Sequence, residues 1–390
     1  MKDNHVHVLY IITKLELGGA QKVCLNLAHG ININGHSSSL ISGTEGVFVS
    51  EAKKLKSTFL LDNFKREVGF NGLWNEFKLF TQIIAIIKKL KKEYPNLVVH
   101  THSTKAGIIG RWAAFFAGVK TIIHTVHGFG FNDYQSKLKK SAILFVEYLT
   151  CLITTHFVCV SQKDRELGIK KFPKFGLKSS IIRAAAEWEK FYTPAKLVPQ
   201  AFGSGFDKFV IGTVSCFKPQ KNLFDLLNAF KIVYQQIDLE MRDQVQLQII
   251  GDGVMRGMIE HWINMNNLTG SVVLLGWQDN TAKFMRKWNV FSMSSLWEGL
   301  PIAIIEARLC RLPVVAYDVG GIFEVIFNDK NGFLVPPKNI DLLAKKLKLL
   351  VENPSLAVQM GQFNDELSEF SDTVMLQKHI DLYCKLTGFN

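Results

Sequence analysis

The two carboxylates best placed for chemistry in this chain are Glu298 and Glu306, eight positions apart. The turn Glu298-Gly299-Leu300-Pro301 predicts a loop that leads into a helix, because proline is well tolerated at a helix start. Glu306 then falls within the first two helical turns, so both carboxylates can face one crevice. Helix-terminal N–H groups suit a phosphate, and carboxylates accept pairs of hydroxyl hydrogen bonds. The pattern favours a ligand with phosphate and hydroxyl groups, such as a nucleotide sugar; the alternative is a surface loop with solvated glutamates.

Several glycine loops and two lysines follow predicted strands, which is the context that a phosphate site requires. Glycine lets the backbone approach a ligand closely, and a lysine at a helix entry can neutralise a diphosphate. A structural turn or a solvated lysine remains the alternative at each position. The candidate residues are Gly18, Gly19, Lys218, Lys221, Gly251, Gly320 and Gly321.

His127 directly follows a predicted strand and precedes Gly128, so it is a candidate for contact with a substrate. A histidine at the carboxyl end of a parallel strand faces the ligand crevice and can donate a hydrogen bond at neutral pH. His102 occupies a comparable position after its own strand. His124 lies within its strand and is expected to be a packed core residue. A purely structural role stays open for each of the three.

Motifs for other chemistries are missing from the sequence. It contains no Asp-x-Asp pair, no His/Cys/Asp cluster at metal-ligand spacing, no Gly-x-Ser-x-Gly elbow and no complete Gly-x-Gly-x-x-Gly fingerprint. We therefore expect no metal and no cofactor, and lysine and helix-terminal amides would have to stabilise a leaving group.

The elements that would hold these residues alternate between strands and helices, which predicts parallel sheets covered by helices on both faces. Apolar strands are expected at residues 5–13, 38–42, 57–61, 97–101, 121–125, 156–160 and 181–184. In the second half they are expected at residues 209–214, 246–250, 272–275, 290–293, 314–317 and 332–335. Helices are expected at residues 20–31, 73–94, 105–117 and 137–154, and further helices fall between the later strands.

Periodicity is lost at residues 185–207, which collect Pro194, Pro199, Gly203 and Gly205. We predict a first domain over residues 1–190, a linker over 191–207 and a second domain over 208–390, with the last helix able to pack back on the first domain. Both domains are expected to be doubly wound α/β sheets, with a ligand crevice between them.

The 390 residues divide unevenly in charge. Residues 1–200 carry 28 lysines and arginines against 14 aspartates and glutamates, a balance of +14, whereas residues 201–390 have a balance of −2. Basic residues interleaved with apolar ones suit an anionic membrane surface, and no nucleic-acid motif accompanies them. A solvated basic face without a partner is the alternative. Six scattered cysteines, no signal peptide and no apolar run long enough to span a membrane predict a cytoplasmic protein.

Taken in order, these residues resemble the retaining glycosyltransferases of family 4, which have the GT-B fold of two Rossmann-like domains. The resemblance runs from Gly18-Gly19 to Asn331-Gly332, and the Glu298/Glu306 pair is its most specific part. It implies that Glu306 binds the nucleotide ribose, that Glu298 contacts the donor sugar and that His127 lies at the reacting sugar. It also implies that Lys221 and the amides near Gly320-Gly321 bind the diphosphate, that Gly18-Gly19 lines the donor and acceptor side, and that no metal is needed.

Two positions depart from the family pattern. Cys216 stands five residues before Lys221, where members commonly have an arginine, and Lys218 is the nearest substitute. A lysine is a point charge and not a bidentate fork, so the diphosphate contacts are open at this place. Ala184-Ala185-Ala186 replaces an Asn-Gly turn.

The segments of residues 100–107 and 125–129 resemble a narrower group of members, which act on lipid-diphosphate carriers in surface polysaccharide assembly. The resemblance therefore implies transfer of a hexose or N-acetylhexosamine, with a UDP-sugar as the expected donor, to a lipid-linked saccharide. The expected place is the cytoplasmic face of the cell membrane, with peripheral contact through the basic domain and no nucleic-acid partner. A nucleotide-sugar epimerase on the same fold and a non-enzymatic basic membrane-binding module remain alternatives.

Overall fold

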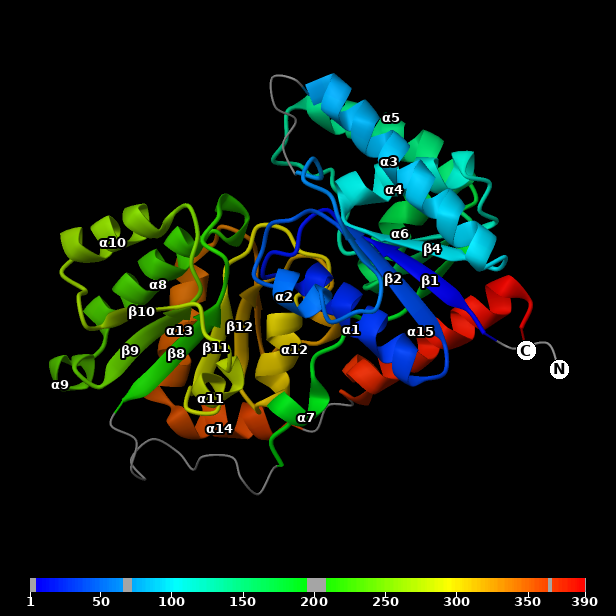
Figure 1. The fold of residues 1–390 in the computed structure, drawn as a ribbon. Coiled ribbons are helices and arrows are strands. Elements are labelled where there is room, and N and C mark those ends of the chain that lie inside the picture. The colour runs from blue at the N-terminus through cyan, green and yellow to red at the C-terminus, as the bar shows by residue number, and fades with distance from the viewer. Residues whose placement is uncertain (1–4, 66–71, 195–207, 364–366, 390) are drawn as a thin grey trace. The chain divides into compact units, whose positions relative to one another are not determined.

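The structure is a computed structural model that describes residues 5–65, 72–194, 208–363 and 367–389. It divides into two compact units, which are considered separately (Figure 1). The first unit comprises residues 1–184 together with 372–390, and the second comprises residues 185–371. The C-terminal helix therefore belongs to the first unit.

The first unit is built on an open sheet of seven strands in the order β3-β2-β1-β4-β5-β6-β7. All of its neighbouring strands pair in parallel. Burial of whole strands such as β1, rather than of alternate residues, is typical of a parallel sheet with both faces covered. The strands are β1 (His7–Ile11), β2 (Ser37–Ser42), β3 (Thr58–Leu60), β4 (Val98–His102), β5 (Thr121–Val126), β6 (His156–Cys159) and β7 (Ser179–Ile181).

Two groups of helices cover this sheet. In Figure 1, α3, α4 and α5 lie on one side of the sheet, and α1 and α15 lie together on the other. Apolar side chains of α3, such as Leu79 and Ile83, pack with Leu9 and Val99 of the central strands. The helices are α1 (Gly19–Ile33), α2 (Val49–Ala52), α3 (Gly72–Glu93), α4 (Thr104–Phe116), α5 (Lys137–Ile153), α6 (Gln162–Lys171) and α15 (Asp372–Thr387).

The second unit repeats this plan with six parallel strands in the order β10-β9-β8-β11-β12-β13. They are β8 (Phe209–Val214), β9 (Val245–Ile250), β10 (Val272–Gly276), β11 (Val290–Met293), β12 (Val314–Tyr317) and β13 (Gly332–Val335). The helices are α7 (Trp188–Phe191), α8 (Leu223–Gln236), α9 (Leu239–Arg242), α10 (Arg256–Met265), α11 (Thr281–Met285), α12 (Ile302–Leu309), α13 (Ile340–Glu352) and α14 (Pro354–Gln362). Two doubly wound parallel sheets confirm the predicted fold class.

Most predicted elements lie within two residues of their observed bounds, apart from the last strand of the first unit and the unpredicted helices α2, α6 and α7. The last strand of the first unit, predicted at residues 181–184, is β7 and ends at Ile181. Helix α6 was not predicted, because its strongly charged sequence carries little apolar periodicity. Of the predicted linker, residues 195–207 lie outside the described residues, and the domain limits at 190 and 208 stay predictions. Among the described helices, none combines the length and apolar character needed to cross a bilayer.

Candidate active site

Nine predicted residues of the second unit lie at one edge of its sheet. The strands β9, β8, β11 and β12 are consecutive neighbours and run parallel, so their carboxyl ends share that edge. The loop after β8 holds Lys218 and Lys221, and the loop after β9 begins with Gly251. The loop after β11 leads into α12 and carries Glu298, Gly299 and Leu300, with Glu306 in the helix itself. The loop after β12 holds Gly320 and Gly321.

Lys221 and Glu298 join the loops after β8 and β11. The Lys221 Nζ donates to Glu298 Oε1 at 2.5 Å, and their side chains are only 17% and 9% exposed. Two further bonds run beside this ion pair: Gln220 Nε2 donates to the carbonyl of Trp297 at 2.7 Å, and the Leu296 amide donates to the carbonyl of Gln220 at 2.9 Å. The carboxylate thus holds the ammonium group at the loop edge, where the remaining N–H donors of the ammonium can bind an incoming anion.

Glycines let the outer loops approach their neighbours. Gly320 has φ of +58°, and a methyl group at this position would overlap the carbonyl oxygen of Glu298. The amide of Gly321 donates to the carbonyl of Gly299 at 2.6 Å. Gly251, with φ of +136°, packs equally closely against the carbonyl of Ser215. Each of the four loops is therefore tied to the next along the sheet edge.

Glu306 lies in the second turn of α12, as predicted, and is 3% exposed. The helix is anchored by the fully buried Arg308, whose guanidinium donates to the carbonyls of Leu312 at 2.7 Å and Met360 at 3.4 Å. These bonds fix the rotation of α12 and hence the direction of the Glu306 side chain. Sequence reasoning did not identify Arg308, because its partner Met360 lies far along the chain on helix α14.

The other three predicted residues, Gly18, Gly19 and His127, lie at the carboxyl edge of the first sheet. Gly18 precedes α1 in extended backbone, Gly19 is the first residue of that helix, and His127 directly follows β5. The intervening strand β4 ends beside them, and Ser103, after it, adopts φ of +65°. Its hydroxyl is 2.9 Å from that of Thr13, which also accepts from the Ala106 amide at 3.2 Å. Ser103 and Thr13 were not predicted, and no local pattern marks them.

His127 is bonded to His102 and leads into a group of buried histidines. His127 Nε2 and His102 Nδ1 are 2.9 Å apart, and the ring of His102 lies 4.5 Å from that of His100. His100 bonds Tyr383 of α15 at 2.7 Å and Thr125 at 2.7 Å. The candidate residue thus connects through β4 to the C-terminal helix.

Burial decides the charge of these rings. Loss of solvent, assisted by His379, lowers the pKa of His127 to about 3. The same cause lowers the pKa of His100 and of His102 well below the ordinary value. Neutral imidazoles at physiological pH can each donate one hydrogen bond and accept one, which suits contact with sugar hydroxyls. His124 is buried and bonds Thr101 at 2.9 Å within the sheet, in agreement with its predicted core role.

In the described ranges, no three histidine, cysteine, aspartate or glutamate side chains gather as they would around a metal ion. The expectation of metal-free chemistry stays a prediction.

Lys218 is partly buried in the loop after β8, two residues from Cys216.

Two family models match the chain, one in each half. Glycosyltransferase Family 4 matches residues 17–176, and Glycosyl transferases group 1 matches residues 198–366. Together they take in nearly every residue discussed above.

Comparison with individual proteins agrees with these models. The chain is 28% identical over 98% of both sequences to the UDP-Gal:α-D-GlcNAc-diphosphoundecaprenol α-1,3-galactosyltransferase of Escherichia coli. It is 24% identical to the capsular polysaccharide biosynthesis glycosyltransferase CapM of Staphylococcus aureus, over 79% of this chain and 82% of CapM. Sucrose-phosphate synthase from Thermosynechococcus elongatus has the same fold, with a TM-score of 0.81 and 20% identity over 98% of this chain and 99% of its own.

Proposed function

Because the chain belongs to the glycosyltransferases of family 4 and has their GT-B fold, we propose that it moves one sugar from a UDP-sugar to a lipid-linked saccharide. The sugar is a hexose or N-acetylhexosamine, and the anomeric configuration is retained. One observation carries this proposal: four neighbouring loops of the second unit bring a lysine and two carboxylates together at one sheet edge.

The second unit holds the donor in this proposal. Glu306 accepts hydrogen bonds from the ribose hydroxyls, and Glu298 contacts the donor sugar. Lys221 binds the diphosphate with help from Lys218 and from the amides of the loop after β12, while Gly251, Gly299 and Leu300 line the site. The ion pair between Lys221 and Glu298 keeps the ammonium in place before the anion arrives. Fixed charges of this kind stabilise a leaving group without reorganisation during the reaction.

The reaction breaks the bond between the anomeric carbon and the diphosphate oxygen. The acceptor hydroxyl attacks the same face of the sugar, and its proton passes to the departing phosphate oxygen. His127 contacts the reacting sugar as a neutral hydrogen-bonding group, and Gly18 and Gly19 line the donor and acceptor side. Lysine and backbone amides replace a metal in neutralising the leaving group.

The acceptor is a saccharide on a lipid diphosphate carrier in surface polysaccharide biosynthesis. Support comes from the Escherichia coli relative, which is named for transfer to α-D-GlcNAc-diphosphoundecaprenol and matches over 98% of both chains. The first 200 residues have a charge balance of +14, so an anionic membrane surface would attract the domain that receives such an acceptor. We accordingly propose peripheral association with the cytoplasmic face of the cell membrane.

Thermal stability with nucleotides tests the donor site. UDP at about a hundred times its dissociation constant should stabilise the folded wild type by about 2.7 kcal/mol. GDP and ADP at the same concentration should stabilise it less, and Glu306→Ala should abolish the UDP effect. Glu240→Ala, at an exposed glutamate of α9, is the matched control and should behave as wild type. A shift that persists in Glu306→Ala would contradict the ribose role.

Two activity measurements test the finer proposals. The product of a UDP-sugar reaction should have the same anomeric configuration as the donor, which NMR of the product shows directly. Activity should survive removal of divalent cations with EDTA. Inversion of the configuration would refute the retaining mechanism, and loss of activity that added Mg²⁺ or Mn²⁺ restores would refute metal independence.

A further inference from the structure

Helix α5 exposes an apolar stripe to solvent. Leu138, Phe145, Leu149 and Leu152 are 83%, 63%, 37% and 60% exposed. Together with the exposed Ala142 they recur at alternating intervals of four and three residues, so they form one side of the helix. We call these five residues the α5 outer face.

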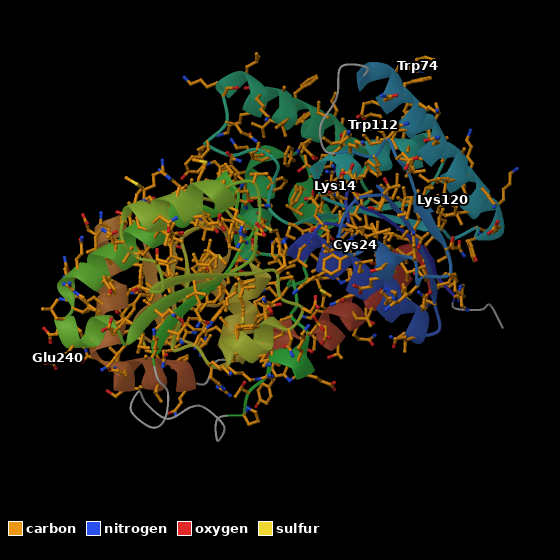
Figure 2. The ribbon with its side chains drawn as sticks, turned by 60° about the vertical axis from the view of Figure 1, so that its left-hand side comes forward. Lys14, Cys24, Trp74, Trp112, Lys120 and Glu240 are labelled. Atoms are coloured by element: carbon orange, nitrogen blue, oxygen red, sulfur yellow. The ribbon has the colours of Figure 1, made fainter. Side chains whose placement is uncertain are left out.

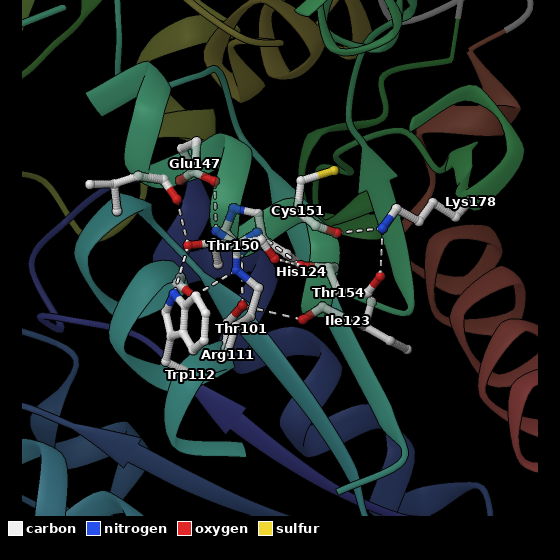
Figure 3. Close-up of polar contacts among 12 residues, drawn as sticks. Thr101, Arg111, Trp112, Ile123, His124, Glu147, Thr150, Cys151, Thr154 and Lys178 are labelled. Atoms are coloured by element: carbon white, nitrogen blue, oxygen red, sulfur yellow. Dashed lines mark hydrogen bonds and ion pairs between the residues drawn. The ribbon is translucent and has the colours of Figure 1, made fainter. Parts of the chain in front are cut away.

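The side of α5 that faces the protein carries, beside the apolar Ile143, Leu144 and Cys151, a set of polar contacts with α4 (Figure 3). Glu147 accepts from the fully buried Arg111 of α4 at 2.8 Å, and Thr150 accepts from the indole N–H of Trp112 at 2.9 Å. Arg111 also donates to Thr154 at 3.2 Å. A surface helix of a globular protein ordinarily turns its apolar residues inward and its polar residues to solvent, so the continuous exposed stripe of α5 is unusual.

The inner contacts fix the rotation of α5. Turning the helix to bury the α5 outer face would strand Arg111, which has no exposure, without its carboxylate partner. An unpaired buried charge is strongly unfavourable, by several kcal/mol in measured cases. The exposure of the stripe is therefore a built-in property of the unit.

Neighbouring elements add apolar surface and positive charge. Phe115 and Phe116 at the end of α4 are 47% and 60% exposed, and α4 packs against both α3 and α5. Trp74, near the start of α3, is 73% exposed and projects outward in Figure 2. Lys137 and Lys139 are exposed in the first turn of α5 itself. A row of exposed apolar residues beside lysines is typical of a helix that lies in a bilayer interface.

We propose that the α5 outer face docks into an anionic lipid bilayer, with α5 parallel to the membrane plane and its lysines at the headgroups. Charge complementarity favours lipid over a second copy of the chain, because two domains with a balance of +14 would repel each other. The lipid-linked acceptor explains why the enzyme needs such a surface, and in this respect the docking surface rests on the proposed function.

Vesicle binding of the full chain tests this surface. Wild-type protein should float with vesicles of phosphatidylglycerol and phosphatidylethanolamine, and weakly or not at all with phosphatidylcholine. The double variant Phe145→Gln/Leu149→Gln should lower the partition coefficient about 100-fold, since each buried apolar side chain contributes about tenfold. Leu177→Gln is the matched control, because Leu177 is 89% exposed in the same unit but lies outside α5. It should bind as wild type.

The outcomes separate this proposal from the proposed function. Loss of vesicle binding with an unchanged UDP-induced thermal shift supports docking through α5. Vesicle binding by the double variant equal to wild type overturns it, as does a wild type that binds no anionic vesicle. A wild-type dimer that the double variant converts to monomer, with vesicle binding unchanged, also overturns it and assigns the surface to a second copy. Failure of the nucleotide shift alone would count against the donor site and leave the docking surface standing.

Discussion

The carboxyl edges of the two sheets are built by different means. In the second unit, four loops adjacent at the sheet edge hold one another through backbone bonds and the Lys221–Glu298 pair. In the first unit, the candidate residue His127 is held by His102, and behind it His100 reaches Tyr383 on the last helix. One edge thus depends on short loops, and the other depends on side chains brought together from distant parts of the chain.

The two units differ in titratable residues as sharply as in architecture. Every histidine except His261 lies in the first unit. Burial lowers the pKa of His7 and of His379 to about 4, and that of His124 well below its ordinary value. No comparable group of buried imidazoles exists among the described residues of the second unit. The comparison teaches that one fold can make its two halves respond differently to acid.

Mild acid should lower the stability of the first unit more than that of the second, and this is the largest effect that we expect. Between a folded pKa of about 4 and an unfolded value of about 6.5, only the unfolded chain binds the proton at His7 or His379. Each fully buried histidine therefore removes up to about 1.4 kcal/mol of folding stability for every pH unit that is lost within this window, and stability is restored above about pH 6.5. Hydrogen exchange at pH 7 and at pH 4.5 should show the strands of the first unit losing protection first.

Asp164 in the first unit acts in the opposite direction. Burial raises the pKa of its carboxyl to about 7, so the folded state binds the proton more readily and gains stability as the pH falls towards 4. One such group opposes several buried histidines, and the net effect should remain destabilising. Earlier loss of protection in the second unit at pH 4.5 would contradict the comparison.

Substitution of a glycine by alanine should lower the free energy of unfolding more in the second unit than in the first. We expect this difference to be smaller than the effect of acid. Gly320→Ala places a methyl group against the carbonyl of Glu298 and should lower the free energy of unfolding by about 3 kcal/mol through strain and displacement of the loop. Gly35 in the first unit has φ of +79° with no atom near an added methyl group, so Gly35→Ala should lower it by only about 1 kcal/mol. Urea unfolding measures both.

UDP binding distinguishes a displaced loop from general strain. Gly320→Ala should also weaken the UDP-induced thermal shift, whereas Gly35→Ala should leave it intact. Equal losses of stability in the two variants would mean that backbone strain alone, and not the approach of the loops, requires glycine at residue 320.

The fold was predictable because its signals are local. Apolar runs of four to six residues separated by helical periodicity indicate parallel strands, and β8, β11, β12 and β13 have the predicted bounds. Helix α6 escaped prediction because its charged residues conceal the periodicity. Its start is marked only by Ser161, which accepts from the Asp164 amide at 3.0 Å.

The candidate site was predictable where it depends on loops and not where it depends on packing. Turn chemistry indicated Gly320 and Gly251, and both have the positive φ that glycine permits. No spacing connects His100 with Tyr383, which lie 283 positions apart. The exposure of the apolar stripe of α5 was hidden for the same reason, since Arg111 and Glu147 become partners only when α4 packs on α5.

Substitution of His102 is the most specific test of how the carboxyl edge of the first sheet is held, and it has the smallest expected effect. His102→Phe keeps a ring in the core but removes the hydrogen bond that orients His127. We expect kcat to fall about tenfold, because a mispositioned hydrogen-bonding group acts mainly on the reacting state, while the KM for the donor stays unchanged. Stability should fall by about 1 kcal/mol, because His127 Nε2 loses its partner, whereas His102 Nε2 is buried without a hydrogen-bond partner among the described residues and has none to lose.

His379→Phe is the control for a general effect of removing a buried imidazole. His379 is equally buried, and its Nδ1 bonds the carbonyl of Met375 at 2.8 Å within α15 and not His127. The variant should keep kcat near the wild-type value. If both variants lower kcat alike, the histidines support the sheet edge as a packed group, and His102 has no special role in positioning His127. A rise in donor KM with an unchanged kcat in His102→Phe would instead place its influence on binding. The separate changes in kcat and KM therefore decide whether the side chains at the carboxyl edge of the first sheet orient a reacting group. The loops at the carboxyl edge of the second sheet are proposed to do the same.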